Sequence, residues 1–94
     1  MQQANRVGMQ TVLATDIGAG TSFSMLRTMG EAYKVQQLGG YPMSVFESLY
    51  KCTLGAAKAL HLDDEIGCFG KGRKADFIVW IMPPHLPSRY AWTI

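Results

Sequence analysis

Charged residues are scarce in this chain of 94 residues, of which they make up 17%, whereas hydrophobic residues make up 48%. An average soluble domain carries about 25% charged residues, so this composition indicates surfaces that are covered by more protein. The nine Lys and Arg and the seven Asp and Glu residues give a net charge of +2 and form no basic block. A basic face is what attaches a protein to the phosphates of a nucleic acid. We therefore expect no nucleic-acid partner.

Paired cysteines and long apolar runs are also missing. Cys52 and Cys68 form no CxxC motif and no disulfide-dense pattern, which favours a reducing environment. No run approaches the roughly 18 consecutive apolar residues of a membrane span, and residues 1–6 lack the apolar core of a signal peptide. We therefore expect a soluble, cytoplasmic protein that contacts no membrane.

Candidate metal ligands are few. The two histidines, His61 and His85, belong to no HxH or HExxH motif. A zinc site needs three or four ligands that converge on one point. We therefore expect this chain alone to hold no catalytic zinc, and we assign no function to Cys52, which is expected to pack as a small apolar residue, or to Cys68, at most an exposed thiol.

The first half of the chain predicts a strand followed by helices. Residues 11–15 form a short apolar, β-branched run that predicts a buried strand, and the glycines of residues 16–20 predict a loop. Apolar residues then recur at helical spacing over residues 23–38, with Thr21 or Ser22 as the expected cap. The pair Gly39-Gly40 is expected to end this helix.

Two shorter helices and a last strand are expected next. Ser44 and Glu47 fit a capping box at the start of a second helix, and residues 53–62 predict a third one capped by Thr53. Residues 75–82 are apolar at successive positions, which is typical of a strand buried on both faces. Such a strand needs neighbours on both sides, and this chain supplies few. Part of its sheet is therefore expected to be missing.

Asp16 is the most informative polar residue, because it lies where the first expected strand ends and a glycine-rich loop begins. In α/β sheets and barrels, loops at this end of the strands surround the ligand, so a metal ligand or a general base is one interpretation. The other is an Asx turn, a frequent structural role of Asp before Gly. The basic residues Lys71, Arg73 and Lys74 are expected to form a solvated turn.

Two stretches of the sequence carry a resemblance to a known family. The motif TDIGAGTSFSML (residues 15–26), continued by EAYK (residues 31–34), resembles the region of the eighth barrel strand in guanine deaminases. The motif TLGAAKAL (residues 53–60), followed by LDD (residues 62–64) and ADF (residues 75–77), resembles the C-terminal signature of the amidohydrolase superfamily. The chain is thus similar to the C-terminal quarter of a guanine deaminase.

The resemblance implies an α/β fold. The chain is expected to be a C-terminal fragment of a (β/α)8 metal-dependent hydrolase barrel with part of its small β-sandwich, and to be rich in helix when isolated. Residues 1–62 then correspond to the last strand and helices of the barrel, residues 63–82 to the segment that returns to the sandwich, and residues 83–94 to a tail. Unpaired strand edges predict self-association, as a homo-oligomer or through the two exposed strands.

The resemblance also implies an activity, the hydrolysis of guanine to xanthine and ammonia by a zinc-dependent enzyme. Asp16 matches the aspartate that binds the zinc and takes a proton from the attacking water. The family's other metal ligands and guanine-binding residues have no counterpart in this sequence, so the chain alone is expected to be inactive. The alternative is a non-enzymatic binding or structural module that derives from the same fold.

Overall fold

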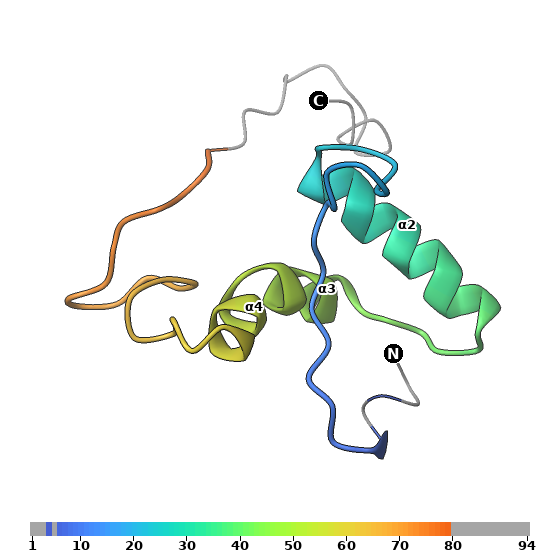
Figure 1. Cartoon of the computed structure of the whole chain (residues 1–94), viewed down its shortest axis with the longest axis horizontal. Helices are drawn as coiled ribbons and strands as arrows, with labels where there is room; N and C mark the ends of the chain where they lie inside the picture. The colour runs from blue at the N-terminus through green and yellow to red at the C-terminus, as the bar shows by residue number, and fades with distance from the viewer. Residues whose placement is uncertain (1–3, 5, 80–94) are drawn as a thin grey trace.

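A computed structural model describes residue 4 and residues 6–79, and within this part of the chain it contains three α-helices of six residues or more (Figure 1). They are α2 (Met25–Leu38), α3 (Val45–Cys52) and α4 (Leu54–Ala59). Helix α2 packs against α3, and α3 packs against α4. None of these helices is both long enough and apolar enough to cross a membrane. The three expected helices are therefore present, in the expected order.

The start of α2 differs from its prediction. Ser24 is the N-cap, and its hydroxyl accepts a hydrogen bond from the backbone N–H of Arg27 at 3.4 Å. Ser22, one of the two expected caps, instead accepts a hydrogen bond from the N–H of Ser24 at 3.0 Å. The prediction of Thr21 or Ser22 as the cap was wrong by two residues or more, because three nearby hydroxyl residues precede this helix and the backbone turns into it only after Ser24.

The end of α2 follows its prediction closely. The N–H of Gly40 donates to the carbonyl of Gln37 at 3.0 Å, and the N–H of Tyr41 donates to the carbonyl of Gln36 at 2.9 Å. This pair of bonds is a Schellman motif, which needs a left-handed residue just after the helix. Gly40 fills that position with a φ of +73°, which a glycine adopts without steric cost.

Half of the predicted capping box is formed at α3. The hydroxyl of Ser44 accepts a hydrogen bond from the N–H of Glu47 at 3.0 Å, as expected of an N-cap. The Glu47 carboxylate accepts its hydrogen bonds from the hydroxyl of Tyr41, at 2.9 and 3.0 Å. The reciprocal bond of the box is thereby replaced by one that ties α3 to the loop before it.

Helix α4 is shorter than the predicted residues 53–62. Its chain reverses at His61, which has a φ of +55°. The N–H of Leu62 donates to the carbonyl of Ala57 at 2.9 Å, so this helix also ends in a Schellman-type turn, with histidine in the place usually taken by glycine. Thr53 stands at the N-cap, as predicted, but its hydroxyl donates to the carbonyl of Leu49 at 2.7 Å and makes no capping bond.

The two predicted strands are absent from the described residues. Residues 11–15 are extended and pass beside α3, where the N–H of Leu13 donates to the carbonyl of Lys51 at 3.2 Å (Figure 1). Residues 75–79 form neither helix nor strand, and residues 80–82 of that expected strand lie outside the described part, as does the tail 83–94. Over residues 11–15 and 75–79 the strand predictions were wrong, because a strand requires a neighbour to pair with and neither segment has one among the described residues. Residues 11–15 are half-buried or exposed rather than buried.

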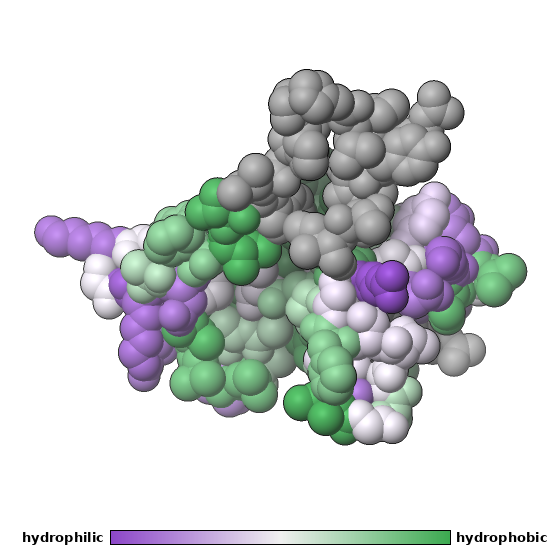
Figure 2. All heavy atoms as spheres, turned by 90° about the horizontal axis from the view of Figure 1, so that it is seen from above, coloured by the Kyte–Doolittle hydropathy of each residue, from purple (hydrophilic) through white to green (hydrophobic). Residues whose placement is uncertain are grey.

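The hydrophobic core of the described residues is small. Its buried hydrophobic residues are Met29, Met43 and Ala57, whereas seventeen large hydrophobic side chains are exposed. Figure 2 shows hydrophobic side chains lying among polar ones on the visible face. This number of exposed hydrophobic side chains agrees with the low charge content, which indicates surfaces that are covered by more protein.

Candidate functional site

Asp16 lies at the first residue of a tight loop that connects the extended segment to α2. Its backbone is left-handed, with a φ of +53°, a conformation that Asp adopts more readily than most residues. Its carbonyl accepts hydrogen bonds from the N–H groups of Gly20 at 2.7 Å and Ala19 at 3.3 Å. The backbone carbonyl of Asp16 thus closes the loop. An Asx turn, in which the side-chain carboxylate would accept such a bond instead, does not form here.

Gly20 is required by this loop. A Cβ atom on Gly20 would lie 1.6 Å from the carbonyl oxygen of Thr15 and 2.8 Å from that of Asp16. Gly18 has a φ of +118°, which side chains rarely allow. The two glycines therefore let the chain fold back on itself immediately after Asp16, and the carboxylate is left on an exposed residue at the tip.

The other candidate residues are scattered. His61 is exposed at the end of α4, and Cys68 is exposed in the turn region after it. Cys52 is half-buried on α3, where burial raises the pKa of its thiol, as fits a packing role. His85 lies outside the described residues. Over residues 6–79, no group of three or more His, Cys, Asp or Glu side chains converges as a metal site requires.

The chemistry of Asp16 fits one ligand of a zinc site. A carboxylate oxygen is a normal zinc ligand, but three or four ligands are needed to hold the ion. The described residues supply no such set around Asp16. Among the described residues, the site is therefore a single exposed carboxylate on a closed loop.

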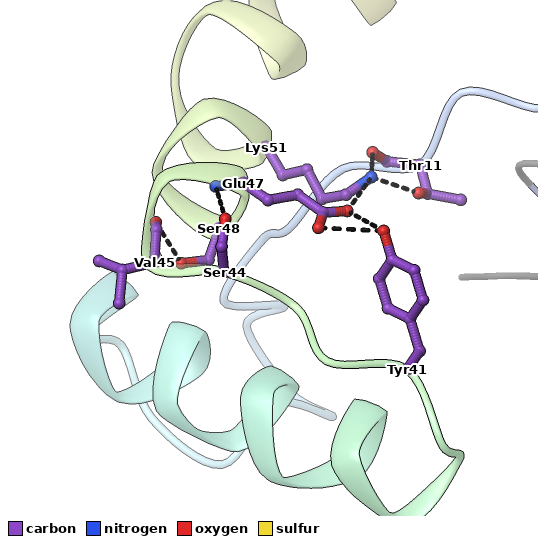
Figure 3. A network of polar contacts seen from close by, with 7 residues as sticks. All are labelled: Thr11, Tyr41, Ser44, Val45, Glu47, Ser48 and Lys51. Atoms are coloured by element: carbon purple, nitrogen blue, oxygen red, sulfur yellow. Dashed lines mark hydrogen bonds and ion pairs between the residues drawn. The ribbon is translucent and has the colours of Figure 1, made fainter.

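Lys51 was missed by the sequence analysis. This lysine of α3 is only 7% exposed. Its ammonium group donates to the hydroxyl of Thr11 at 2.8 Å and to the carbonyl of Thr11 at 3.1 Å, and it lies 4.0 Å from the carboxylate of Glu47 (Figure 3). The same carboxylate accepts the Tyr41 hydroxyl, and this hydrogen bond raises the pKa of Tyr41. A polar network thus joins α3 to two segments that flank it.

The basic residues near the end of the described part also differ from their prediction. Arg73 is half-buried, and its guanidinium donates to the carbonyls of Asp63 and Ile66, the latter at 3.3 Å. Lys74 is solvated, as predicted, and pairs with Glu65. Arg73 therefore stabilises the backbone turn after α4 and is not simply solvated.

Comparison with known proteins identifies the family to which this chain is similar. Residues 2–89 match the model of the Amidohydrolase family. The chain is 56% identical over 78 residues to the guanine deaminase of Escherichia coli (strain K12), a match that covers 83% of this chain and 17% of that protein. It is 42% identical over 79 residues to the probable guanine deaminase of Deinococcus radiodurans, covering 81% of this chain and 18% of that protein. An imidazolonepropionase of Agrobacterium fabrum is 38% identical over 82 residues.

The fold agrees with these matches. The solved structure of E. coli guanine deaminase superposes with a TM-score of 0.75 and 52% sequence identity, over 80% of this chain and 18% of that one. The chain thus spans less than a fifth of the proteins it matches, which is less than the quarter that the resemblance implied. The resemblance to guanine deaminases is confirmed, the described helices form a piece of the corresponding fold, and this chain belongs to the amidohydrolase family.

Proposed function

We propose that this chain is part of a zinc-dependent guanine deaminase, which hydrolyses guanine to xanthine and ammonia. The observation that carries the proposal is the 56% identity to a guanine deaminase, together with 52% identity in a structural match. The identity to imidazolonepropionases is lower, at 34% and 38%, which favours guanine as the substrate. Because the chain corresponds to less than a fifth of such an enzyme, it is inactive alone and works only with the remainder.

Asp16 is the residue through which this chain enters the reaction. When bound, zinc makes water acidic enough to supply hydroxide near neutral pH. The Asp16 carboxylate would be one of the residues that hold this ion, and it would hold the proton lost by the attacking water until that proton leaves with the amino group as ammonia. The closed loop of residues 16–20 serves this role by presenting the carboxylate at a fixed point after the extended segment.

The division of the chain follows from the same proposal. Residues 1–62 provide the last strand and helices of a barrel, residues 63–82 lead back to a small β-sandwich, and residues 83–94 are a tail. The exposed hydrophobic side chains then cover other parts of the same protein or a second copy of it. The setting of such an enzyme is the cytoplasm, in keeping with its two unpaired cysteines.

A graft tests the assignment. The corresponding segment of E. coli guanine deaminase is replaced by this chain, and xanthine formation is measured with the variants D16N and D64N. Asn tolerates a left-handed backbone, so D16N removes the charge without straining the loop, whereas Ala would do both. D64N is the matched control, because Asp64 is an exposed carboxylate remote in sequence from the loop.

The expected result is an active graft in which D16N lowers turnover by about 10² to 10⁴ and D64N leaves it unchanged. Guanine turnover by D16N at the rate of D64N would contradict the role of Asp16. A folded, zinc-loaded graft that is inert toward guanine would instead favour the alternative, a non-enzymatic module derived from this fold.

A further inference from the structure

Lys51 of α3 is a charged residue that is buried. A lysine this deeply buried is rare unless it is paired, because an ammonium group loses its hydration on burial. The group has three donors, and two of them meet the hydroxyl and carbonyl oxygens of Thr11. The Glu47 carboxylate lies 4.0 Å away, within reach of an ion pair but too far for a hydrogen bond. Its burial is thus compensated, and two of the three partners belong to one residue forty positions away in the sequence (Figure 3).

The backbone of Lys51 holds the same segment a second time. Its carbonyl accepts the N–H of Leu13 at 3.2 Å, two residues beyond Thr11. One residue of α3 therefore fixes residues 11–13 at three points, through its side chain and its backbone. Asp16 follows only three residues after Leu13, at the end of the same extended segment.

Among the described residues this segment has no sheet neighbour, so its contacts with Lys51 attach it to the helices. In the proposed complete enzyme, where the segment is the last barrel strand, these contacts add to its pairing with other strands. An extended chain without ladder partners has many accessible conformations, and each residue that is fixed costs entropy. The contacts with Lys51 are the hydrogen bonds that the described residues show between residues 11–13 and the helices. The direction in which the chain enters the Asp16 loop depends on them.

We infer that Lys51 is a positioning residue, which clamps residues 11–13 onto α3 and thereby places the Asp16 loop relative to the helices. The clamp itself is a property of this chain. Its consequence for catalysis rests on the proposed function of Asp16. The two claims are therefore tested by separate measurements.

The clamp is tested on the full chain by amide hydrogen exchange, with K51M, T11V and the double variant. Met keeps the apolar stem of Lys51 and removes the charge, while Val keeps the shape of Thr11 and removes the hydroxyl. K58M, at an exposed lysine of α4, and T11S, which keeps the hydroxyl, are the controls. Circular dichroism follows the helices of each variant.

Exchange of the Leu13 N–H is expected to rise about tenfold in K51M and severalfold in T11V, with no further effect of T11V in the K51M background. T11S and K58M should match the unaltered chain. Removing one partner of a buried polar contact leaves the other partners unsatisfied and is destabilising, so the helices should melt somewhat earlier in K51M than in the unaltered chain. If K51M lost its helices, the clamp would be judged from Leu13 exchange in T11V, since this variant leaves the lysine in place. Equal Leu13 exchange in T11V and T11S would overturn the clamp.

The catalytic consequence is tested in the graft. K51M is expected to lower kcat by about 10-fold to 100-fold, because a displacement of about 1 Å is enough for such a loss, with KM changed less than about threefold. T11S should restore what T11V loses. Faster Leu13 exchange in K51M with an unchanged kcat would overturn the positioning role and leave the clamp. Full activity of D16N would instead refute the proposed function, whatever K51M does.

Discussion

The helical middle of the molecule and its extended flanks differ in where their backbone hydrogen bonds go. In α2, α3 and α4, the N–H groups beyond the first turn find acceptors three or four residues away. Serines cap the starts of α2 and α3, and left-handed residues end α2 and α4. Residues 11–15 make one backbone hydrogen bond to α3, and residues 75–79 form no regular element (Figure 1). The middle therefore needs only its own sequence to take its backbone shape, whereas the flanks need other segments to define theirs.

This difference explains what a piece of a larger fold retains. Helices satisfy their backbone locally, so they persist even where the hydrophobic core is small. A strand satisfies its backbone through neighbours, and the neighbours of both flanks are expected in the remainder of the guanine-deaminase-like protein. The flank before α2 is an exception in one respect, since Lys51 holds part of it from the helical side.

The largest expected effect contrasts glycines of the two regions. Gly20 lies in the loop after the first flank, where a Cβ would meet the carbonyl oxygen of Thr15, and Gly30 lies within α2 with open space around it. G20A should cost the loop roughly 1–3 kcal/mol and displace Asp16, while G30A should stabilise α2 by about 0.5–1 kcal/mol. NMR shifts of residues 15–20 and thermal melting measure the two effects. Unchanged loop shifts in G20A would refute the close approach.

A smaller effect is expected at the end of α2, where two adjacent glycines differ in conformation. Gly40 has a φ of +73°, while Gly39 has a φ of −79°. G40A should destabilise the helix by about 1–2 kcal/mol, the usual cost of a left-handed residue with a Cβ. G39A should cost less, because its Cβ would come no closer than 3.4 Å to any neighbour, the carbonyl oxygen of Gln36. Circular dichroism during heating measures both variants. Equal losses of helicity in G40A and G39A would show that the Schellman turn does not determine where α2 ends.

The same contrast explains how much the sequence could predict. The existence and order of the helices, the stop at Gly40 and the Ser44 cap all depend on interactions within a few residues, and all were predicted. The early end of α4 was not, because His61 takes a conformation for which glycine is the usual signal. Local patterns fixed the helices to within a turn.

Features that depend on contacts between distant segments were not predicted correctly from the sequence. The burial of Lys51 follows from a contact with a residue forty positions earlier, which no periodicity reveals. The strands at residues 11–15 and 75–82 were predicted from their apolar composition, which indicates burial in a sheet but cannot supply the partner strands. Asp16 was located by the end of the apolar run and by family resemblance, and its role stays a prediction.

The smallest expected effect concerns the turn region that connects α4 to the second flank, and its dependence on pH. Lys74 pairs with Glu65 near the end of α4, and the N–H of Lys74 donates to the Glu65 carbonyl at 2.8 Å. The hydrogen bond from Lys74 lowers the pKa of Glu65 from its ordinary value of 4.5, and the same bond raises the pKa of Lys74 from 10.5. The pair thus contributes fully between these two ordinary values. Its contribution is lost as pH falls through the lowered pKa of Glu65, or as pH rises through the raised pKa of Lys74.

Both side chains are largely exposed, so solvent and salt should screen this pair strongly. An NMR titration of the Glu65 carboxyl should give a pKa below 4.5 that moves back toward 4.5 in K74M and in 1 M salt, while K71M, which alters a neighbouring exposed lysine, should leave it in place. The melting of the helices should be the same in the unaltered chain, in K74M and in K71M across this pH range, because the pair lies outside α2, α3 and α4. A shift in helix melting that tracks the Glu65 titration would mean that the second flank supports the helical middle, and that the two regions are less independent than their hydrogen bonds indicate.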